Sequence, residues 1–209
     1  MTSYTVRDWV TVGLFGALWG AMELTLGSAL HTAFPPLTNT FLTGVVMSGI
    51  GAVIALTGKL FVPKGGSVLL IGVVCALLKL LGIGGVRIGP IIAIIVQSTL
   101  IEVALLILPA SRWAFVVAGA LAVSWNLPHM LIMPQILLGK SAGEVYNQVV
   151  QQGSQWLGLD PSVAFFILGA LLSLQLLIGA VGGWGAWGLG AAVEYRLGRH
   201  PTGMSEDSD

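Results

Sequence analysis

Ionisable side chains interrupt several long apolar runs in this chain. Glu23, Lys79, Glu102 and His129 each stand inside sequence that otherwise belongs in lipid. A charged side chain near the centre of a bilayer costs about 3 kcal/mol or more, so such residues face a partner, water or a ligand. We therefore expect a membrane protein that handles a polar ligand.

The composition and the apolar runs predict the elements that position these residues. Hydrophobic residues make up 56% of the chain and charged residues 9%, with a mean hydropathy of +0.92, whereas soluble domains carry about 25% charged residues. Runs of the roughly 20 residues that cross a bilayer occupy residues 9–30, 40–58, 66–83, 89–109, 112–138 and 161–183. We predict an all-α integral membrane protein, a bundle of six transmembrane helices, with Pro128 and Pro134 bending the fifth.

Lysine and arginine are distributed unevenly over the connections between these runs. With the N terminus inside, the cytoplasmic side holds Arg7, Lys59, Lys64, Arg112, Arg196 and Arg199, and the outer side holds Arg87 and Lys140. An excess of positive charge marks the cytoplasmic side. We predict a multi-pass protein of the cytoplasmic (inner) cell membrane with both termini in the cytoplasm. Residues 1–195 form a single transmembrane domain, and residues 196–209 form a disordered tail.

The predicted outer connections are chemically richer than the inner ones. The first contains His31 and the consecutive residues Pro35 and Pro36, which stiffen it, and the third places four glycines around Arg87, where the backbone can approach a ligand closely. The fifth carries apolar residues on one helical stripe, with Glu144 and three glutamines opposite. It predicts an amphipathic helix that either lies on the membrane surface or covers a pocket.

Polar residues from four predicted helices fall at a similar depth in the outer half of the membrane. At about 1.5 Å of rise per residue, Glu23, Lys79, Gln97, Asn126 and His129 form one layer. Such a layer is what a ligand pocket open to the outside needs. The predicted substrate-binding residues are Glu23, His31, Lys79, Arg87, Gln97, Trp125, Asn126, His129, Trp156 and, deeper as a floor, Gln175.

Most of these residues also have a purely structural explanation. Lys79 is close enough to the membrane boundary to extend its ammonium group into water, or it forms a structural ion pair with Glu23. Glu102 lies past the midplane, so we expect it to stabilise helix packing or a partner contact. His129 could be a core histidine with its hydrogen bonds satisfied, and the tryptophans could be interfacial anchors.

Small residues recur at four-residue spacing in the first helix and in the last apolar stretch. The two sets are Gly13, Ala17 and Ala21, and Gly182, Ala186 and Gly190. Small residues at this spacing let another helix approach closely. Either face could pack internally, but we expect both to dock onto a partner.

Together these features resemble the substrate-binding S components of energy-coupling factor (ECF) transporters, small bacterial membrane proteins that capture vitamins and related micronutrients. The resemblance covers nearly the whole chain: its length, its six predicted helices, and the Gly13, Ala17 and Ala21 face, which is similar to the family's Ala-xxx-Ala surface for the transmembrane coupling subunit. Gly13 departs from that motif. The resemblance implies a substrate site in the outer half, under the first, third and fifth connections.

The resemblance implies ligand binding rather than catalysis. The protein would capture its ligand outside and reorient within a complex whose energy comes from separate ATP-binding subunits. No GxxxxGK[ST] nucleotide motif occurs in the sequence, and no cofactor or metal is expected. The implied roles are hydrogen bonding to a vitamin-like heterocycle for Glu23, Asn126 and His129, contact with an anionic group for Arg87 or Lys79, and ring stacking for Trp125 or Trp156.

Other classes of protein stay open as alternatives. For an intramembrane enzyme, no HExxH motif occurs, and Ser48 with His129 is the one conceivable serine–histidine pair. A stand-alone secondary transporter or channel would often show inverted repeats, which are not evident, and an accessory subunit would lack a polar layer.

Scattered basic residues argue against a nucleic-acid partner. The single cysteine, Cys75, excludes an internal disulfide.

Overall fold

The computed structural model describes residues 3–33, 41–81 and 88–196, and all regular secondary structure within these ranges is helical. Three features predicted from the sequence lie outside the described residues: the prolines of the first connection, Arg87, and the acidic tail. The side chain of His31 also lies outside them. The described elements are α1 (Val6–Ala33), α2 (Phe41–Phe61), α3 (Ser67–Leu80), α4 (Ile88–Ile107), α5 (Arg112–Ser124), α6 (Asn126–Leu138), α7 (Ala142–Leu157), η1 (Pro161–Val163) and α8 (Ala164–Arg196).

Within these described ranges, five helical segments are long and apolar enough to cross a membrane, which indicates a multi-pass membrane protein. They are Val6–Gly27, Thr43–Phe61, Ile88–Ile107, Arg112–Leu138 and Pro161–Val193. The predicted third span corresponds to α3, which has 14 residues and therefore extends only about 21 Å. The hydrocarbon core of a bilayer is about 30 Å thick, so α3 by itself is too short to cross it.

The last two predicted spans are present, with differences in detail. Residues 112–138 make one segment long enough to cross the membrane, in which helices α5 and α6 meet at Trp125, a residue that keeps helical backbone angles. The final helix continues from the predicted end at residue 183 to Arg196. Trp184 and Trp187 therefore lie within α8 and not beyond its end.

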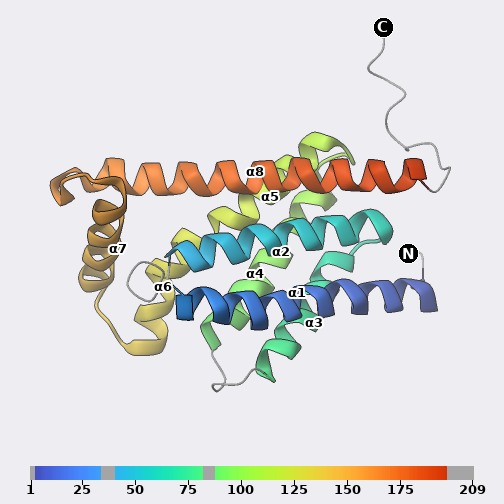
Figure 1. The fold of residues 1–209 in the computed structure, drawn as a ribbon, viewed down its shortest axis with the longest axis horizontal. Coiled ribbons are helices and arrows are strands. Elements are labelled where there is room, and N and C mark those ends of the chain that lie inside the picture. Colours follow the sequence, from blue (N-terminus) through green and yellow to red (C-terminus); the bar gives the residue numbers. More distant parts are fainter. Residues whose placement is uncertain (1–2, 34–40, 82–87, 197–209) are drawn as a thin grey trace, which may run out of the picture.

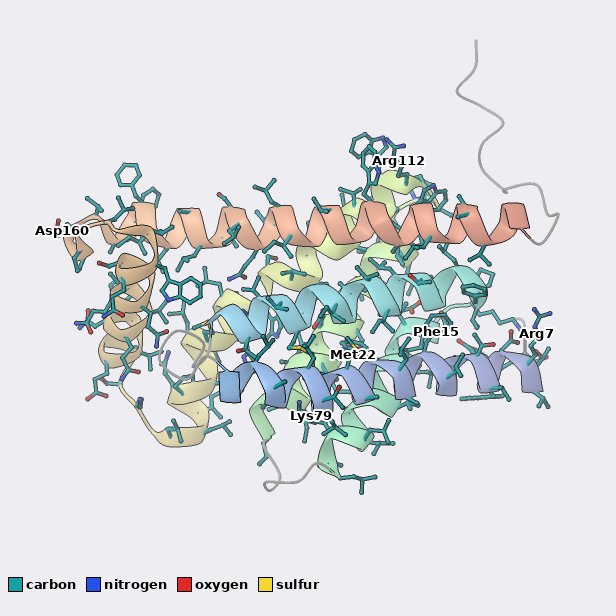
Figure 2. The ribbon with its side chains drawn as sticks, in the orientation of Figure 1. Arg7, Phe15, Met22, Lys79, Arg112 and Asp160 are labelled. Atoms are coloured by element: carbon teal, nitrogen blue, oxygen red, sulfur yellow. The ribbon has the colours of Figure 1, made fainter. Side chains whose placement is uncertain are left out.

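The long helices define the two ends of the bundle. In Figure 1, α2 runs antiparallel to its neighbour α1, and α8 runs along the opposite edge of the molecule. The N-terminal end of α1 and the C-terminal end of α8 lie at one end of the bundle, whereas α6 and α7 lie at the other. Arg7 and Arg112 accordingly lie well away from Asp160, which precedes α8 (Figure 2). Arg7 and Arg112 thus lie towards the end of the bundle opposite the α6–α7 region.

Glycines allow α5 and α8 to pack with their backbones in contact. A Cβ atom placed on Gly179 of α8 would lie 2.7 Å from the Cα atom of Ala120 in α5, and one on Gly183 would enter the carbonyl of Phe115. Nearby in α8, Ala186 is fully buried and Gly190 packs against Leu60 of α2. The small residues of α8 are therefore used inside the bundle, and the expectation that they dock onto a partner is wrong.

The small residues of α1 divide between two faces. Gly16 and Gly20 pack against Val74 and Leu78 of α3. Gly13 has open space where its side chain would be, and Ala17 and Ala21 are exposed. The face predicted for partner binding is thus uncovered in the isolated chain.

The close contact between α5 and α8 predicts the effect of enlarging a glycine. Gly179→Val should lower the stability by roughly 2 kcal/mol or more, because the side chain would push the two backbones apart. Thermal unfolding in detergent measures the loss. Gly185→Val is the matched control on the same helix, where a Cβ atom meets nothing within 4 Å. Equal destabilisation by both substitutions would contradict the packing described here.

Candidate ligand-binding site

The break between α5 and α6 lies at the centre of the candidate site. Pro128 has no N–H group to donate to the carbonyl of Ser124, and its ring crowds that carbonyl, so the helix cannot continue regularly through this point. The backbone N–H of Leu127 instead donates to the Oε1 atom of Gln175 in α8, at 3.2 Å. The side chain of Gln175, from another helix, thus provides a hydrogen-bond acceptor for a backbone N–H group at the break.

Three buried N–H donors at this break have no hydrogen-bond partner among the described residues. They are Nε1 of Trp125, Nδ2 of Asn126 and Nε2 of Gln175. Asn126 is 8% exposed and Gln175 is 0% exposed. A buried donor without a partner costs about 1–3 kcal/mol, so native proteins retain such groups mainly where a ligand, an ion or water completes them.

The other buried polar atoms without a described partner are more dispersed. They are Nε1 of Trp19, Oγ1 of Thr57 and Oγ of Ser67, which belong to α1, α2 and α3. Each comes from a different helix, and none adjoins the α5–α6 break in sequence. The break is therefore where neighbouring residues leave donors unpaired together.

His129 connects the break to the first turn of α4. Its Nε2 atom lies 3.0 Å from the carbonyl oxygen of Gly89. Because a carbonyl only accepts, this contact assigns the hydrogen to Nε2 and leaves Nδ1 as the acceptor of the neutral ring. The Trp125 indole lies edge-on to the imidazole, with 6.4 Å between ring centroids. The two rings form one wall of the break.

Helix α2 contributes backbone groups to the same region. The Nε2 atom of Gln97 donates to the carbonyl of Ser48 at 2.6 Å. One turn earlier, Gly44 leaves room for Asn126, whose Oδ1 atom would lie 2.7 Å from a Cβ atom at that glycine. Gln97, Asn126, His129 and Gln175 thus surround this part of α2 and α6. Sequence reasoning missed Gly44 and considered Ser48 only as a possible partner of His129, because backbone roles carry no residue signature.

A narrow hollow lies between α6, α7 and α8. Its lining residues are Met130, Val149, Gln152, Gly153, Trp156 and Leu171. Met130 is one helical turn after Asn126, and Leu171 is one turn before Gln175, so the hollow follows the same helix faces that carry the unpaired donors. It has no room for a water molecule.

Helix α7 turns one side towards the hollow and is capped at its start. Val145, Val149, Val150 and Gly153 are buried, whereas Glu144 is exposed. Ser141 and Glu144 form a capping box, each accepting from the other's backbone N–H. The bonds from Ser141 hold the pKa of the Glu144 carboxyl below its ordinary value. The cap is therefore fully charged at neutral pH.

Glu23 and Lys79 lie apart from this cluster and bind each other. The Nζ atom of Lys79 is 2.8 Å from Oε2 of Glu23 and 3.2 Å from the carbonyl of the same residue. The pair joins α1 to α3, and in the part of the chain that the structure describes neither helix packs against α6. The alternative of a structural ion pair thus describes the observed contact, and the structure does not bring these two residues together with Asn126 and His129.

Glu102 forms a second ion pair at the opposite end of the bundle. Its carboxylate lies 2.7 Å from Nζ of Lys59 and accepts the backbone N–H groups of Gly66 and Val68, each at 2.8 Å. These N–H groups belong to the start of α3, where a negative charge is favourable. Gly66 has a φ of 86°, a conformation that suits glycine. As expected, Glu102 supports helix packing.

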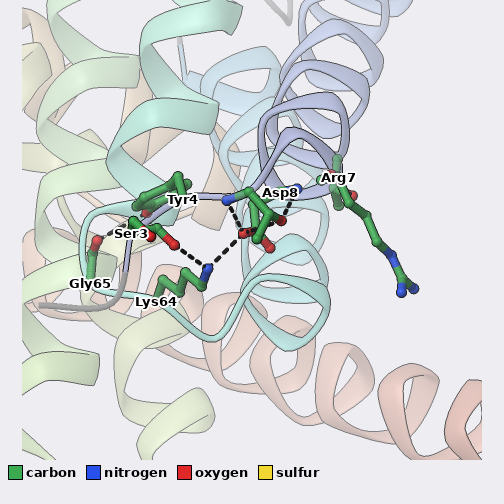
Figure 3. A network of polar contacts seen from close by, with 8 residues as sticks. Ser3, Tyr4, Arg7, Asp8, Lys64 and Gly65 are labelled. Atoms are coloured by element: carbon green, nitrogen blue, oxygen red, sulfur yellow. Dashed lines mark hydrogen bonds and ion pairs between the residues drawn. The ribbon is translucent and has the colours of Figure 1, made fainter.

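A polar network also secures the start of α1 against the connection between α2 and α3 (Figure 3). Lys64 Nζ lies 2.6 Å from Asp8 Oδ2 and donates to the carbonyl of Ser3, while the Tyr4 hydroxyl donates to the carbonyl of Gly65. Burial raises the pKa of the Tyr4 hydroxyl, with the charges of Glu102 and Asp8 adding to the effect. Arg7 points away from this network.

Metal binding finds no support in the described residues. Within residues 3–33, 41–81 and 88–196, no three histidine, cysteine, aspartate or glutamate side chains are grouped so that they could hold a metal ion. In comparisons with known proteins, no protein family, curated protein or solved structure matches this chain.

The contrast between Glu102 and Glu144 predicts two very different truncation effects. Both carboxylates accept backbone N–H groups at a helix start, but Glu102 is buried and paired. Glu102→Ala should cost about 3–5 kcal/mol, because Lys59 would be left buried without a counter-charge. Glu144→Ala, the exposed control, should shift the thermal midpoint much less. Similar shifts for both variants would contradict the capping role of Glu102.

Proposed function

We propose that this chain is the membrane-embedded binding subunit, or S component, of an energy-coupling factor transporter. It captures a small vitamin-like or heterocyclic micronutrient at the outer face of the cytoplasmic membrane. It then reorients within a complex in which separate ATP-binding subunits supply the energy. The proposal combines the sequence resemblance with the site at the α5–α6 break.

The unpaired donors at the break carry this proposal. Trp125, Asn126 and Gln175 each keep a buried N–H group without a partner among the described residues. A protein whose helices only support one another would gain stability by pairing or replacing such groups. A binding protein keeps them because its ligand completes them.

The distribution of charge supports an outward-facing site. Arg7, Lys59, Lys64 and Arg112 occur at the starts or ends of helices near the N-terminal end of α1, whereas α6 and α7 lie at the other end of the bundle. Positive charge favours the cytoplasmic side of a membrane. In this orientation both termini are cytoplasmic, and α7 covers the site from outside.

The exposed face of α1 supports docking onto a coupling subunit. Gly13, Ala17 and Ala21 leave a smooth surface, and Leu14 and Leu18 beside it are 67% and 49% exposed. Small residues permit close approach of a second helix, and dispersion contacts then hold it. This face lies on the helix that the sequence resemblance assigns to the coupling subunit.

Ligand capture predicts a co-purified small molecule. Native mass spectrometry of the purified protein should detect one, and Asn126→Ala or His129→Ala should reduce its retention about tenfold or more, equivalent to roughly 1.4 kcal/mol or more. Asn147→Ala provides the matched control at an exposed position of α7. Retention that is unchanged in both site variants, with folding intact, would reject this binding site.

Assembly provides a separate test of the α1 face. Combined Gly13→Leu and Ala17→Leu substitutions should leave ligand retention intact but prevent co-purification with co-expressed coupling and ATP-binding subunits. Gly185→Leu enlarges an unobstructed glycine on α8 and should not affect assembly. If the α1 variant assembles normally, the complex does not use this face.

A further inference from the structure

We infer that the site at the α5–α6 break takes an uncharged ligand rich in hydrogen-bond acceptors, held by the N–H groups of Trp125, Asn126 and Gln175. The Glu23–Lys79 ion pair lies outside this ligand site. The inference rests on the proposed function and specifies the chemical class of the ligand.

The hydrogen-bonding groups left at the break are mostly donors. An indole nitrogen can only donate, so Trp125 requires an acceptor. Gln175 already accepts from Leu127 through Oε1, which orients its amide and leaves Nε2 to donate. Nδ2 of Asn126 is a third unpaired donor. A ligand that completes this set must present carbonyl oxygens or unprotonated ring nitrogens.

His129 adds one complementary acceptor to these donors. Its Nε2 hydrogen is directed at the carbonyl of Gly89, so Nδ1 of the neutral ring is the nitrogen able to accept from a ligand N–H or O–H group. The neighbouring Trp125 ring offers a flat apolar surface. Together these groups suit a neutral heterocycle or carboxamide with several acceptors and one donor.

Two of the charged side chains predicted to line the site, Glu23 and Lys79, are paired with each other. This ion pair joins α1 to α3, helices that do not pack against α6 among the described residues. An ionic ligand at the break would lose its hydration without gaining a described counter-charge, which is strongly unfavourable. A neutral ligand avoids that loss.

Two sets of substitutions test separately whether the unpaired donors and the Glu23–Lys79 ion pair contribute to ligand retention. Trp125→Phe removes the indole N–H and keeps an aromatic ring, and Gln175→Glu keeps an oxygen for the Leu127 N–H but removes the amide donor. Each should reduce the co-purified small molecule about tenfold, as measured by native mass spectrometry. Glu23→Gln combined with Lys79→Met removes both charges and should change retention by less than about twofold.

The same experiment identifies the ligand class and distinguishes the two proposals. Tandem mass spectrometry of the released molecule should show a compound that is neutral at pH 7. A formally charged molecule, or loss of retention in the Glu23→Gln, Lys79→Met protein with retention intact in Trp125→Phe, would overturn this inference and leave the transport proposal standing. If wild-type protein retains no small molecule, both proposals fail.

A stability measurement provides an independent readout on ligand-free protein. Trp125→Phe should raise the thermal midpoint or leave it unchanged, because it removes a buried donor that has no partner among the described residues. Trp184→Phe is the control, since that indole is 47% exposed. A clear fall in the midpoint for Trp125→Phe alone would show that the indole N–H serves the fold, and would overturn its assignment to the ligand.

Discussion

Every polar group inside an apolar bundle has to find its partner within the protein, because the surroundings contain no water to replace one. This constraint explains the two most demanding points of the fold. At the start of α3, Glu102 accepts two backbone N–H groups and pairs with Lys59. At the α5–α6 break, Gln175 accepts the N–H of Leu127. In both places a side chain from one helix completes the backbone of another and thereby sets how the helices pack.

Close helix packing supplies the framework that holds these partners in place. Gly119 and Gly179 bring the backbones of α5 and α8 together, and this contact places Gln175 beside the end of α5. Glycine costs helix stability in isolation, but inside a bundle it permits contacts that a larger residue would prevent. The same helix pair thus positions both the break and the side chain that satisfies it.

At the candidate site, neighbouring residues together leave several buried donors without a partner among the described residues. Glu23, Lys79, Lys59 and Glu102 are all paired, whereas neighbouring residues at the break retain donors without a partner among the described residues. Local departures from the rules of stable folding, such as buried polar groups without partners, are expected mainly at functional sites. The contrast between fully paired charges and unpaired neutral donors is the basis for proposing ligand capture at this position and for assigning an uncharged ligand to it.

The sequence by itself determined the helical class, the approximate span positions and the polar residues worth considering, because long apolar runs and isolated polar residues are visible without coordinates. It also suggested a distortion near Pro128, but not that Gln175 from a distant helix accepts the N–H of Leu127 there. Only the tertiary structure decided that Glu23 pairs with Lys79 away from His129, and that the small residues of α8 are internal while Gly13, Ala17 and Ala21 of α1 are uncovered. Depth along a helix can be counted from residue numbers, whereas rotation about its axis and the choice of neighbour arise from packing between distant segments.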